Sequence, residues 1–333
     1  MILKYRSYPR AALIGNPSDG YYGKTIAFVF TDFHAEVTLY ESPDLQIMPS
    51  ERDHSTFRSL EHVFHDVKTY GYYGGIRLLK AAVKLFYEYC RDHDIAPDRN
   101  NFTLRYHSTI PHRLGLAGSS AIITAAVRAM AAFYGLEIPV HSFANLVLAV
   151  EKDELLIGAG LQDRVAQAFD GGLIAMDFNR ELMETRGYGR YTRLPVSTIP
   201  NFYLAYRTDL AEGSEVTHGR LAHRYRSGDK RVLAAIEEWS SLTDRFAAAL
   251  KTGNTELLGP LMNRNFDLRA EVCRISPGNR TMVETARGTG ASAKFTGSGG
   301  AIIGTYSDDA MYLRLQKAMR ENKVAVIKPH VKM

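Results

Sequence analysis

The sequence predicts an α+β protein built from two domains. Its 333 residues exceed the roughly 250 to 300 that one hydrophobic core usually holds. Strand-like and helix-like segments are mixed, without the long βαβ series of a doubly wound sheet. A turn-rich stretch follows residue 186 and contains Gly187, Gly189, Pro195 and Pro200. We therefore predict an N-terminal domain over residues 1–190 and a C-terminal domain over residues 191–333.

Hydrophobic periodicity defines the expected elements. The helix at residues 76–93 is the clearest, because apolar residues recur three or four positions apart, at Ile76, Leu79, Val83, Phe86 and Tyr89. The other expected helices span residues 119–134, 142–156, 215–226, 231–250, 256–272, 280–287 and 309–321. The expected strands span residues 24–30, 35–40, 102–108, 172–178, 202–207, 292–295, 301–306 and 324–327.

Composition places the chain among ordinary globular proteins, at 45% hydrophobic and 23% charged. Polar residues interrupt every apolar stretch before the roughly 20 residues that a membrane span needs. The first residues lack the apolar run of a signal peptide, so we expect a cytoplasmic protein. In that compartment Cys90 and Cys273 would be free, buried thiols.

The net charge of +5 does not by itself predict a nucleic-acid partner, because 41 basic residues are scattered among 36 acidic ones. A basic balance also attracts small anionic substrates. We interpret His62 and His65 as solvated residues, since no Cys or carboxylate accompanies them at metal-ligand spacing. We expect no membrane or nucleic-acid partner, and either a monomer or a homodimer.

Residues 111–121 form a glycine-rich segment between an expected strand and an Ala-rich helix. Gly115 and Gly118 allow a close approach of the backbone to a ligand, and Ser119 is a natural N-cap. Free N–H groups and the helix dipole would then face one small volume that suits a phosphate. The segment is neither a Walker A loop nor a dinucleotide-binding fingerprint. A glycine-rich helix start without a ligand is the alternative interpretation.

Three further segments carry polar groups in turn-rich surroundings. Residues 294–303 contain more glycines than a tight hairpin needs, which predicts a ligand close to the backbone or, alternatively, a bulged hairpin. Residues 8–24 combine tyrosines, acids and bases, as the wall of a sugar site does, although a surface loop is the simpler interpretation. Around residues 158–167, Asp163 and the upstream Glu151, Asp153 and Glu154 are candidate magnesium ligands or a candidate base. For Asp163, N-capping of a helix is the alternative.

In order, these segments carry the three motifs of the GHMP kinases between Arg10 and Gly300. The chain resembles this superfamily, which includes galactokinase, homoserine kinase, mevalonate kinase and phosphomevalonate kinase. The resemblance implies a ribosomal-protein-like N-terminal α/β domain, a ferredoxin-like C-terminal domain, and the use of ATP and Mg²⁺. Five stretches are similar to the members that phosphorylate the anomeric hydroxyl of D-glucuronate with ATP: residues 14–23, 75–82, 158–170, 263–269 and 291–302.

The resemblance also implies roles for individual residues. Asp163 would be the base, and Arg10 would stabilise the transferring charge. Ser120 and Glu151 would bind magnesium, and Asp19 would hold sugar hydroxyls. The ATP phosphates would contact Pro111, Gly115, Leu116, Ala117, Gly118, Ser119, Ser120 and Ala121. The third motif would contribute Gly297, Ser298 and Gly299 to the substrate pocket.

A uronic acid requires a cation for its carboxylate. The candidates are Lys24, Arg113, Arg164 and Arg207, and Tyr22 is a further candidate for contact with the sugar. Asn16 and Pro17 stand where galactokinase-like chains have Glu and His, and Arg10 stands where mevalonate kinases have Lys. Two alternatives stay open: a kinase for galactose, arabinose, fucose or a heptose phosphate, or a nucleotide-binding homologue without catalytic activity.

Overall fold

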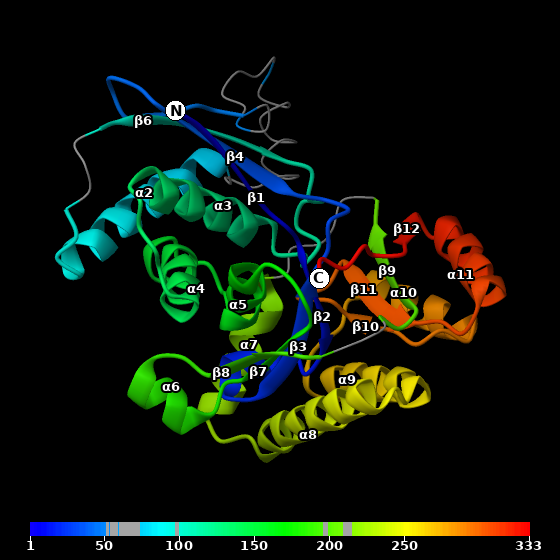
Figure 1. Ribbon diagram of the computed structural model, residues 1–333. Coiled ribbons are helices and arrows are strands. Elements are labelled where there is room, and N and C mark those ends of the chain that lie inside the picture. Colours follow the sequence, from blue (N-terminus) through cyan, green and yellow to red (C-terminus); the bar gives the residue numbers. More distant parts are fainter. Residues whose placement is uncertain (51–52, 54–58, 60–73, 97–99, 196–198, 209–214) are drawn as a thin grey trace. The chain divides into compact units, whose positions relative to one another are not determined.

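The computed structural model in Figure 1 describes residues 1–50, 53, 59, 74–96, 100–195, 199–208 and 215–333, without the side chains of residues 215–220. The chain folds into two units. Unit 1 consists of Met1–Pro9, Phe33–His112 and Ala117–Ala159, and unit 2 of Arg10–Asp32, Arg113–Leu116 and Gly160–Met333. Both units mix mainly antiparallel strands with helices, so the predicted α+β class is confirmed.

Unit 1 contains a four-stranded sheet in the order β1-β4-β6-β5. Strands β1 and β6 pair antiparallel with β4, and the short β5 runs parallel to β6. Helix α3 packs on β1 and β4, and α2 packs on α3. The elements span Ile2–Ser7 (β1), Ala35–Glu41 (β4), Gln46–Ile47 (β5), Gly75–Asp92 (α2), Phe102–Ser108 (β6), Gly118–Phe133 (α3) and Val140–Ala149 (α4), followed by a π turn at Val150–Glu154.

Small side chains allow α3 to lie close to the sheet. Ala121, Ala125 and Ala129 are fully buried, and alanine also has the highest intrinsic helix propensity. On α2 the predicted three-to-four spacing is present, but the buried face is formed by Leu78, Leu79, Ala82, Phe86 and Cys90. The predicted face is therefore correct at Leu79 and Phe86 only, and Ile76, Val83 and Tyr89 are half-buried.

Unit 2 contains two four-stranded antiparallel sheets, in the orders β2-β3-β7-β8 and β10-β11-β9-β12. Helix α8 packs on α9 and β3, while α9 contacts β2 of the first sheet and β10 and β11 of the second. The strands span Arg10–Ile14 (β2), Lys24–Val29 (β3), Ile174–Asp177 (β7), Arg190–Arg193 (β8), Phe202–Arg207 (β9), Lys294–Phe295 (β10), Ala301–Thr305 (β11) and Val324–Ile327 (β12). The helices span Leu161–Phe169 (α5), Arg180–Arg186 (α6), Glu215–Arg226 (α7), Lys230–Thr252 (α8), Leu258–Val272 (α9), Pro277–Gly288 (α10) and Asp309–Glu321 (α11), with 3-10 turns at Ser18–Tyr21 and Thr255–Leu257.

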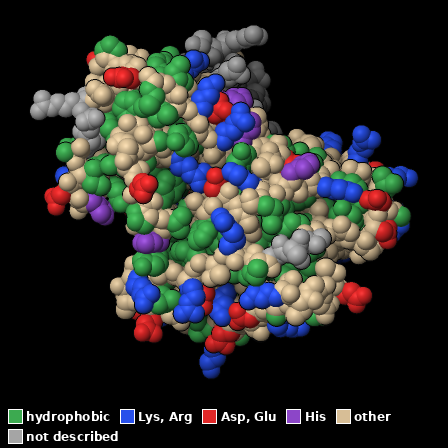
Figure 2. All heavy atoms as spheres, viewed as in Figure 1, with side chains coloured by type: hydrophobic (Ala, Val, Ile, Leu, Met, Phe, Trp, Pro, Cys, Tyr) green, Lys and Arg blue, Asp and Glu red, His purple; other side chains and the backbone are tan. Residues whose placement is uncertain are grey.

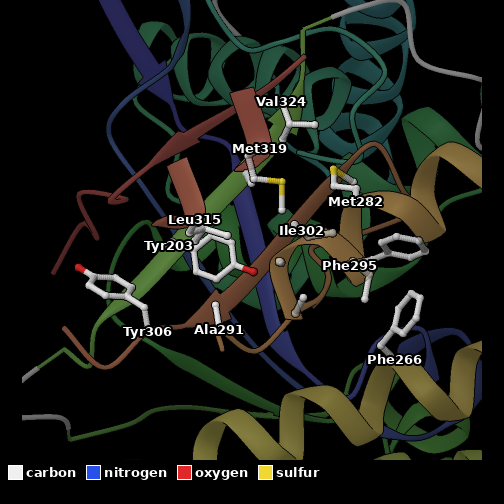
Figure 3. Close-up of a cluster of buried hydrophobic side chains, with 14 of the residues drawn as sticks. Tyr203, Phe266, Met282, Ala291, Phe295, Ile302, Tyr306, Leu315, Met319 and Val324 are labelled. Atoms are coloured by element: carbon white, nitrogen blue, oxygen red, sulfur yellow. The ribbon is translucent and has the colours of Figure 1, made fainter. Parts of the chain in front are cut away.

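A hydrophobic cluster holds the second sheet of unit 2 against α9, α10 and α11 (Figure 3). Phe266 of α9 and Phe295 of β10 meet edge to face, with ring centroids 5.2 Å apart. The fully buried Tyr203 donates a hydrogen bond of 2.7 Å to the carbonyl oxygen of Ser292, which satisfies its polar atom inside the core. These contacts fix β10, and β10 leads directly into the glycine-rich loop at residues 296–300.

Several strands differ from the expectations. Strands β1 and β2 were not expected, because Lys4 and Arg6 interrupt the apolar residues of β1 and β2 begins with Arg and two alanines instead of β-branched residues. Residues 190 and 191, the predicted boundary between domains, both lie in β8, which pairs with β7. That boundary stays a prediction. The helix expected at residues 142–156 is α-helical only to Ala149 and then forms the π turn.

The described side chains also bear on the other expectations. Cys90 is buried, Cys273 is half-buried, and both are free. His62 and His65 lie outside the described residues. Within the described residues, no helix combines the length and the apolar character that crossing a membrane would require. On the face shown in Figure 2, Lys and Arg side chains occur in several places with Asp and Glu among them.

Phe246 tests the packing of α8 in unit 2. Phe246 is fully buried, so Phe246→Ala should lower the free energy of unfolding by about 3 to 5 kcal/mol. Leu233→Ala on the same helix is the control. Leu233 is 38% exposed, so its replacement should lower the free energy of unfolding far less. Urea unfolding followed by the fluorescence of Trp239, the single tryptophan, measures both variants. Equal losses would contradict the packing described here.

Candidate active site

The centre of the candidate site in unit 2 is an ion pair between Arg10 and Asp163. Arg10 begins β2 and is 3% exposed, and its Nη2 lies 2.5 Å from Oδ1 of Asp163 in the first turn of α5. Arg164 lies 3.2 Å from the other carboxylate oxygen. Nη1 of Arg10 also donates to the carbonyl oxygen of Thr296. One guanidinium therefore joins the catalytic candidate on α5 to the third motif.

The two arginines control the charge of Asp163. Burial by itself raises the pKa of this carboxyl group, but the guanidinium groups of Arg10 and Arg164 outweigh it and hold the pKa below its ordinary value. The carboxylate is consequently ionised throughout the neutral range. A carboxylate with a low pKa is a weak base, and its strength lies in accepting a hydrogen bond from a hydroxyl group in a fixed direction.

A second carboxylate, Asp19, lies beside the first. Burial and the neighbouring Asp163 raise the pKa of Asp19 to about 6, although Arg10, Arg164 and a backbone hydrogen bond from Gln162 act in the opposite direction. Gly160, the N-cap of α5, makes this arrangement possible, because a Cβ there would collide with the Asp19 carboxylate. Two carboxylates with pKa values moved in opposite directions are common in active sites.

The glycines of residues 296–300 allow this loop to lie directly against the backbone of residues 113–116. A Cβ on Gly297 would collide with the carbonyl oxygen of Gly115, and a Cβ on Gly115 would lie 2.9 Å from the backbone nitrogen of Ser298. Asn279 fixes the end of the loop by accepting a 2.9 Å hydrogen bond from the Gly300 N–H. The sequence interpretation anticipated a ligand next to these glycines, and the structure shows the 113–116 segment next to them.

The remainder of the phosphate-loop candidate, residues 117–121, belongs to unit 1. Ala117, in a left-handed conformation, is the N-cap of α3, so the expectation that Ser119 caps this helix is wrong. The Ser119 hydroxyl instead donates a 2.6 Å hydrogen bond to the carboxylate of Glu151, which is fully buried in the π turn. Alanine offers no capping side chain, and the start of a helix is a common binding place for a phosphate.

The two serines of this loop have different partners. Ser120 was the expected metal ligand, but it is fully buried and its hydroxyl donates to the carbonyl oxygen of Ala117 at 3.2 Å. Ser119 is the serine in contact with Glu151. Hydroxyl and carboxylate oxygens are the donors that Mg²⁺ prefers, and Mg²⁺ usually completes its shell with phosphates and water. Among the described residues, no group of three or more His, Cys, Asp or Glu side chains could hold a metal ion.

The other predicted sugar-binding residues are engaged in different ways. Lys24 lies 2.8 Å from Asp244 and 4.0 Å from Asp177. Arg164 is 4% exposed and donates to the carbonyl oxygen of Gly160 as well as pairing with Asp163. The guanidinium of Arg180 stacks over the ring of Tyr22, with its Cζ 4.6 Å from the ring centroid. Arg113 is exposed, and Arg207 lies in β9 next to Gly278.

Sequence reasoning missed three buried polar residues that hold the loops of unit 2. Asn265 of α9 accepts a 2.6 Å hydrogen bond from the Gly15 N–H and donates to the Asn16 carbonyl oxygen. Arg269, one turn later, donates to the carbonyl oxygens of Gly297 and Ser298. Nζ of Lys294 contacts the oxygens of Ala12, Asn16 and Phe295. The four-residue spacing of Asn265 and Arg269 on a helix was the available signal.

Buried charge is unusually concentrated here. Lys294 is 1% exposed and Arg269 is 3% exposed, and the hydrogen bonds that the structure shows for both go to neutral oxygens. Burial lowers the pKa of Arg269, and burial together with Arg269 and Arg10 lowers the pKa of Lys294 well below its ordinary value. The charge of Arg269, whose hydrogen bonds go to neutral oxygens, favours an anionic ligand nearby.

Comparison with known proteins identifies the family. Residues 77–171 match the GHMP kinases N-terminal domain, and residues 246–324 match the GHMP kinases C-terminal domain. The chain belongs to the GHMP kinases, so the resemblance inferred from the motifs is confirmed. Membership implies the use of ATP.

Similar proteins include two plant kinases. Glucuronokinase 1 of Arabidopsis thaliana is 41% identical over 308 residues, which cover 90% of this chain and 84% of the relative. Probable glucuronokinase 2 of the same plant is 41% identical over 309 residues, covering 91% and 84%. The crystal structure of Lactococcus lactis galactokinase complexed with galactose matches 99% of this chain and 94% of its own with a TM-score of 0.76 at 15% identity, which shows the shared fold.

The raised pKa of Asp19 predicts a pH-dependent gain in stability when the charge is removed. The pKa of Asp19 is about 6 in the folded protein against an ordinary 3.8, so the ionised side chain destabilises the folded state. This destabilisation is negligible near pH 4 and reaches its full size above about pH 6. Asp19→Asn should therefore raise the free energy of unfolding at about pH 7.5, by up to about 3 kcal/mol at 1.36 kcal/mol per pKa unit, and give no gain at about pH 4.

Urea unfolding at the two pH values measures this effect. Asp244→Asn is the matched control, because Asp244 is 61% exposed and pairs with Lys24, so its replacement should give no gain at either pH. If Asp19→Asn is less stable than the parent at neutral pH, the ionised Asp19 does not destabilise the folded protein and the prediction is wrong.

Proposed function

We propose that the chain transfers the γ-phosphoryl group of ATP to the anomeric hydroxyl of D-glucuronate, giving glucuronate 1-phosphate and ADP. The observation that carries the proposal is the 41% identity to Glucuronokinase 1 over 90% of the chain. The ion pair of Arg10 and Asp163 supports it, because it supplies an ionised carboxylate fixed in direction next to a cation. A homologue that only bound nucleotides would have no need of this arrangement.

In the proposed reaction Asp163 accepts a hydrogen bond from the anomeric hydroxyl. This hydrogen bond orients the hydroxyl so that a lone pair of the hydroxyl oxygen points at the γ-phosphorus. The new O–P bond forms as the bond to the ADP oxygen breaks, and the hydroxyl proton leaves towards Asp163. The transition state is loose, so little negative charge develops on the attacking oxygen before transfer, and a weak base is sufficient. Arg10 stabilises the charge on the phosphoryl group while holding Asp163 in place.

The remaining residues would bind and orient the two substrates. Residues 111–121 would bind the ATP phosphates through backbone N–H groups at the start of α3. Asp19 would accept hydrogen bonds from sugar hydroxyls. The oxygens of Ser119 and Glu151 fit a magnesium ion, which when bound neutralises phosphate charge, and the hydrogen bond between them positions both.

A substrate panel tests the proposed acceptor. With ATP and Mg²⁺, kcat/KM should be highest for glucuronate when glucuronate, galacturonate, glucose and galactose are assayed in parallel. A preference of tenfold or more for a neutral sugar would rule out the uronate as the natural class of substrate while leaving the kinase activity in place. Preference for galactose would favour the alternative of another sugar kinase.

Replacing Asp163 tests the mechanism. Asp163→Asn keeps the shape of the side chain and removes its charge, so kcat should fall about 10² to 10⁴-fold while ATP binding is kept. Calorimetry with a non-hydrolysable ATP analogue beside a rate assay separates the two effects. Asp170→Asn is the control, because Asp170 ends the same helix and pairs with Lys332 at 2.8 Å. Activity of the Asp163 variant within tenfold of the parent would reduce Asp163 to a structural residue.

A further inference from the structure

The proposed substrate has a carboxylate, and two of the four cations expected to hold it have other partners. Lys24 pairs with Asp244, and Arg164 pairs with Asp163. The neighbourhood of Asp19 in unit 2 contains a different pair of donors. The inference below rests on the proposed function, because it concerns the carboxylate of that substrate.

Tyr21 is the first of these donors. It ends the short 3-10 turn that carries Asp19, it is 91% buried, and its ring packs on Tyr225 with centroids 5.0 Å apart. Among the described residues its hydroxyl makes no hydrogen bond to another protein group, and it is not one of the polar atoms that are cut off from solvent, so it can reach a ligand. Burial raises the pKa of Tyr21 to about 12, so the hydroxyl keeps its proton and acts as a donor at neutral pH.

The charges around the Tyr21 hydroxyl come from three elements. Asp19 belongs to its own turn, Arg226 ends α7, and Arg269 lies on α9 next to Cys273, and all of these groups influence the pKa of Tyr21. The N–H groups of Arg269 are directed at the carbonyl oxygens of the 297–298 segment. Arg226 is exposed and, within the part of the chain that the structure describes, has neither a carboxylate nor a hydrogen-bond partner.

The end of α7 is held in position, so Arg226 is not on a loose segment. Arg224 donates to the carboxylate of Asp229 at 2.8 Å and to the carbonyl oxygen of Val272, at the end of α9, at 2.5 Å. The hydroxyl of Tyr225 accepts a 2.8 Å hydrogen bond from Arg180. These bonds tie the last turn of α7 to α9 and α6, next to the turn at residues 18–21.

We propose that the Tyr21 hydroxyl and the Arg226 guanidinium bind the carboxylate of the uronic acid and thereby set the preference of the enzyme for uronates over neutral sugars. A buried phenol and a free guanidinium provide one neutral and one charged donor, which is the combination that a carboxylate accepts well. A neutral hexose presents a hydroxymethyl group in place of the carboxylate. It leaves the guanidinium without a counter-charge and forms only an uncharged hydrogen bond with Tyr21.

The test compares kcat/KM for glucuronate and for glucose in Tyr21→Phe and Arg226→Met. In each variant kcat/KM should fall at least about tenfold for glucuronate and less than about threefold for glucose. The ratio of the glucuronate value to the glucose value should therefore decrease. The controls are Tyr87→Phe, which removes an exposed hydroxyl from α2, and Arg231→Met, which removes an exposed cation from the start of α8. Both controls should keep the ratio of the parent.

The outcomes separate this inference from the proposed function. If the parent enzyme itself does not prefer glucuronate to glucose, the proposed function fails. If the parent prefers glucuronate and both variants keep that preference, the carboxylate is held elsewhere and the subsite is refuted. Equal losses on both sugars would also refute it, because they indicate a structural role. Arg226 is exposed, so its variant stays informative even if Tyr21→Phe folds poorly.

Discussion

The contact between Arg10 and Asp163 is the constraint on which the rest of the unit 2 site depends. It joins the first residue of β2 to the first turn of α5, and the same guanidinium bonds the backbone of the third motif at Thr296. Removing Asp163 would leave the buried charge of Arg10 without its ion-pair partner, which is far more costly than the pair itself is stabilising. The arrangement keeps Asp163 ionised and pointing in one direction, at the expense of a strong base, which is the role that the proposed function gives it.

Among the charged groups around this pair, the basic side chains are buried and outnumber the acidic ones. Arg10, Arg164, Arg269 and Lys294 are almost fully buried, whereas the carboxylates near them are Asp163 and Asp19. Asn265 and Lys294 bond the backbone of residues 12–16, and Arg269 bonds the carbonyl oxygens of Gly297 and Ser298, so these three side chains fix both segments without adding a carboxylate. Under the proposed function, such a site would favour the charge of transferred phosphate and of an acidic sugar, at a cost in stability that is usual for a preorganised active site.

Much of this could be predicted from the sequence, because glycine-rich segments and isolated acids are local signals. Asp163, Arg10 and Glu151 were each predicted from position in a motif, and the helices from periodicity. Contacts between distant segments carry no local signal: the sequence could not show that Ser119 and not Ser120 contacts Glu151, or that Gly297 is small because Gly115 lies against it. Lys24 was a reasonable candidate for the substrate carboxylate until the structure showed Asp244 beside it.

The most direct test of this account is a double-mutant cycle on kcat with Arg10→Met, Asp163→Asn and the two changes together. If the arginine acts largely by holding the carboxylate ionised and aligned, the two residues work as a unit, and the double variant should be about as slow as the slower single variant. If the losses of the two single variants multiply in the double variant, the residues act independently, and the central claim about this ion pair is wrong.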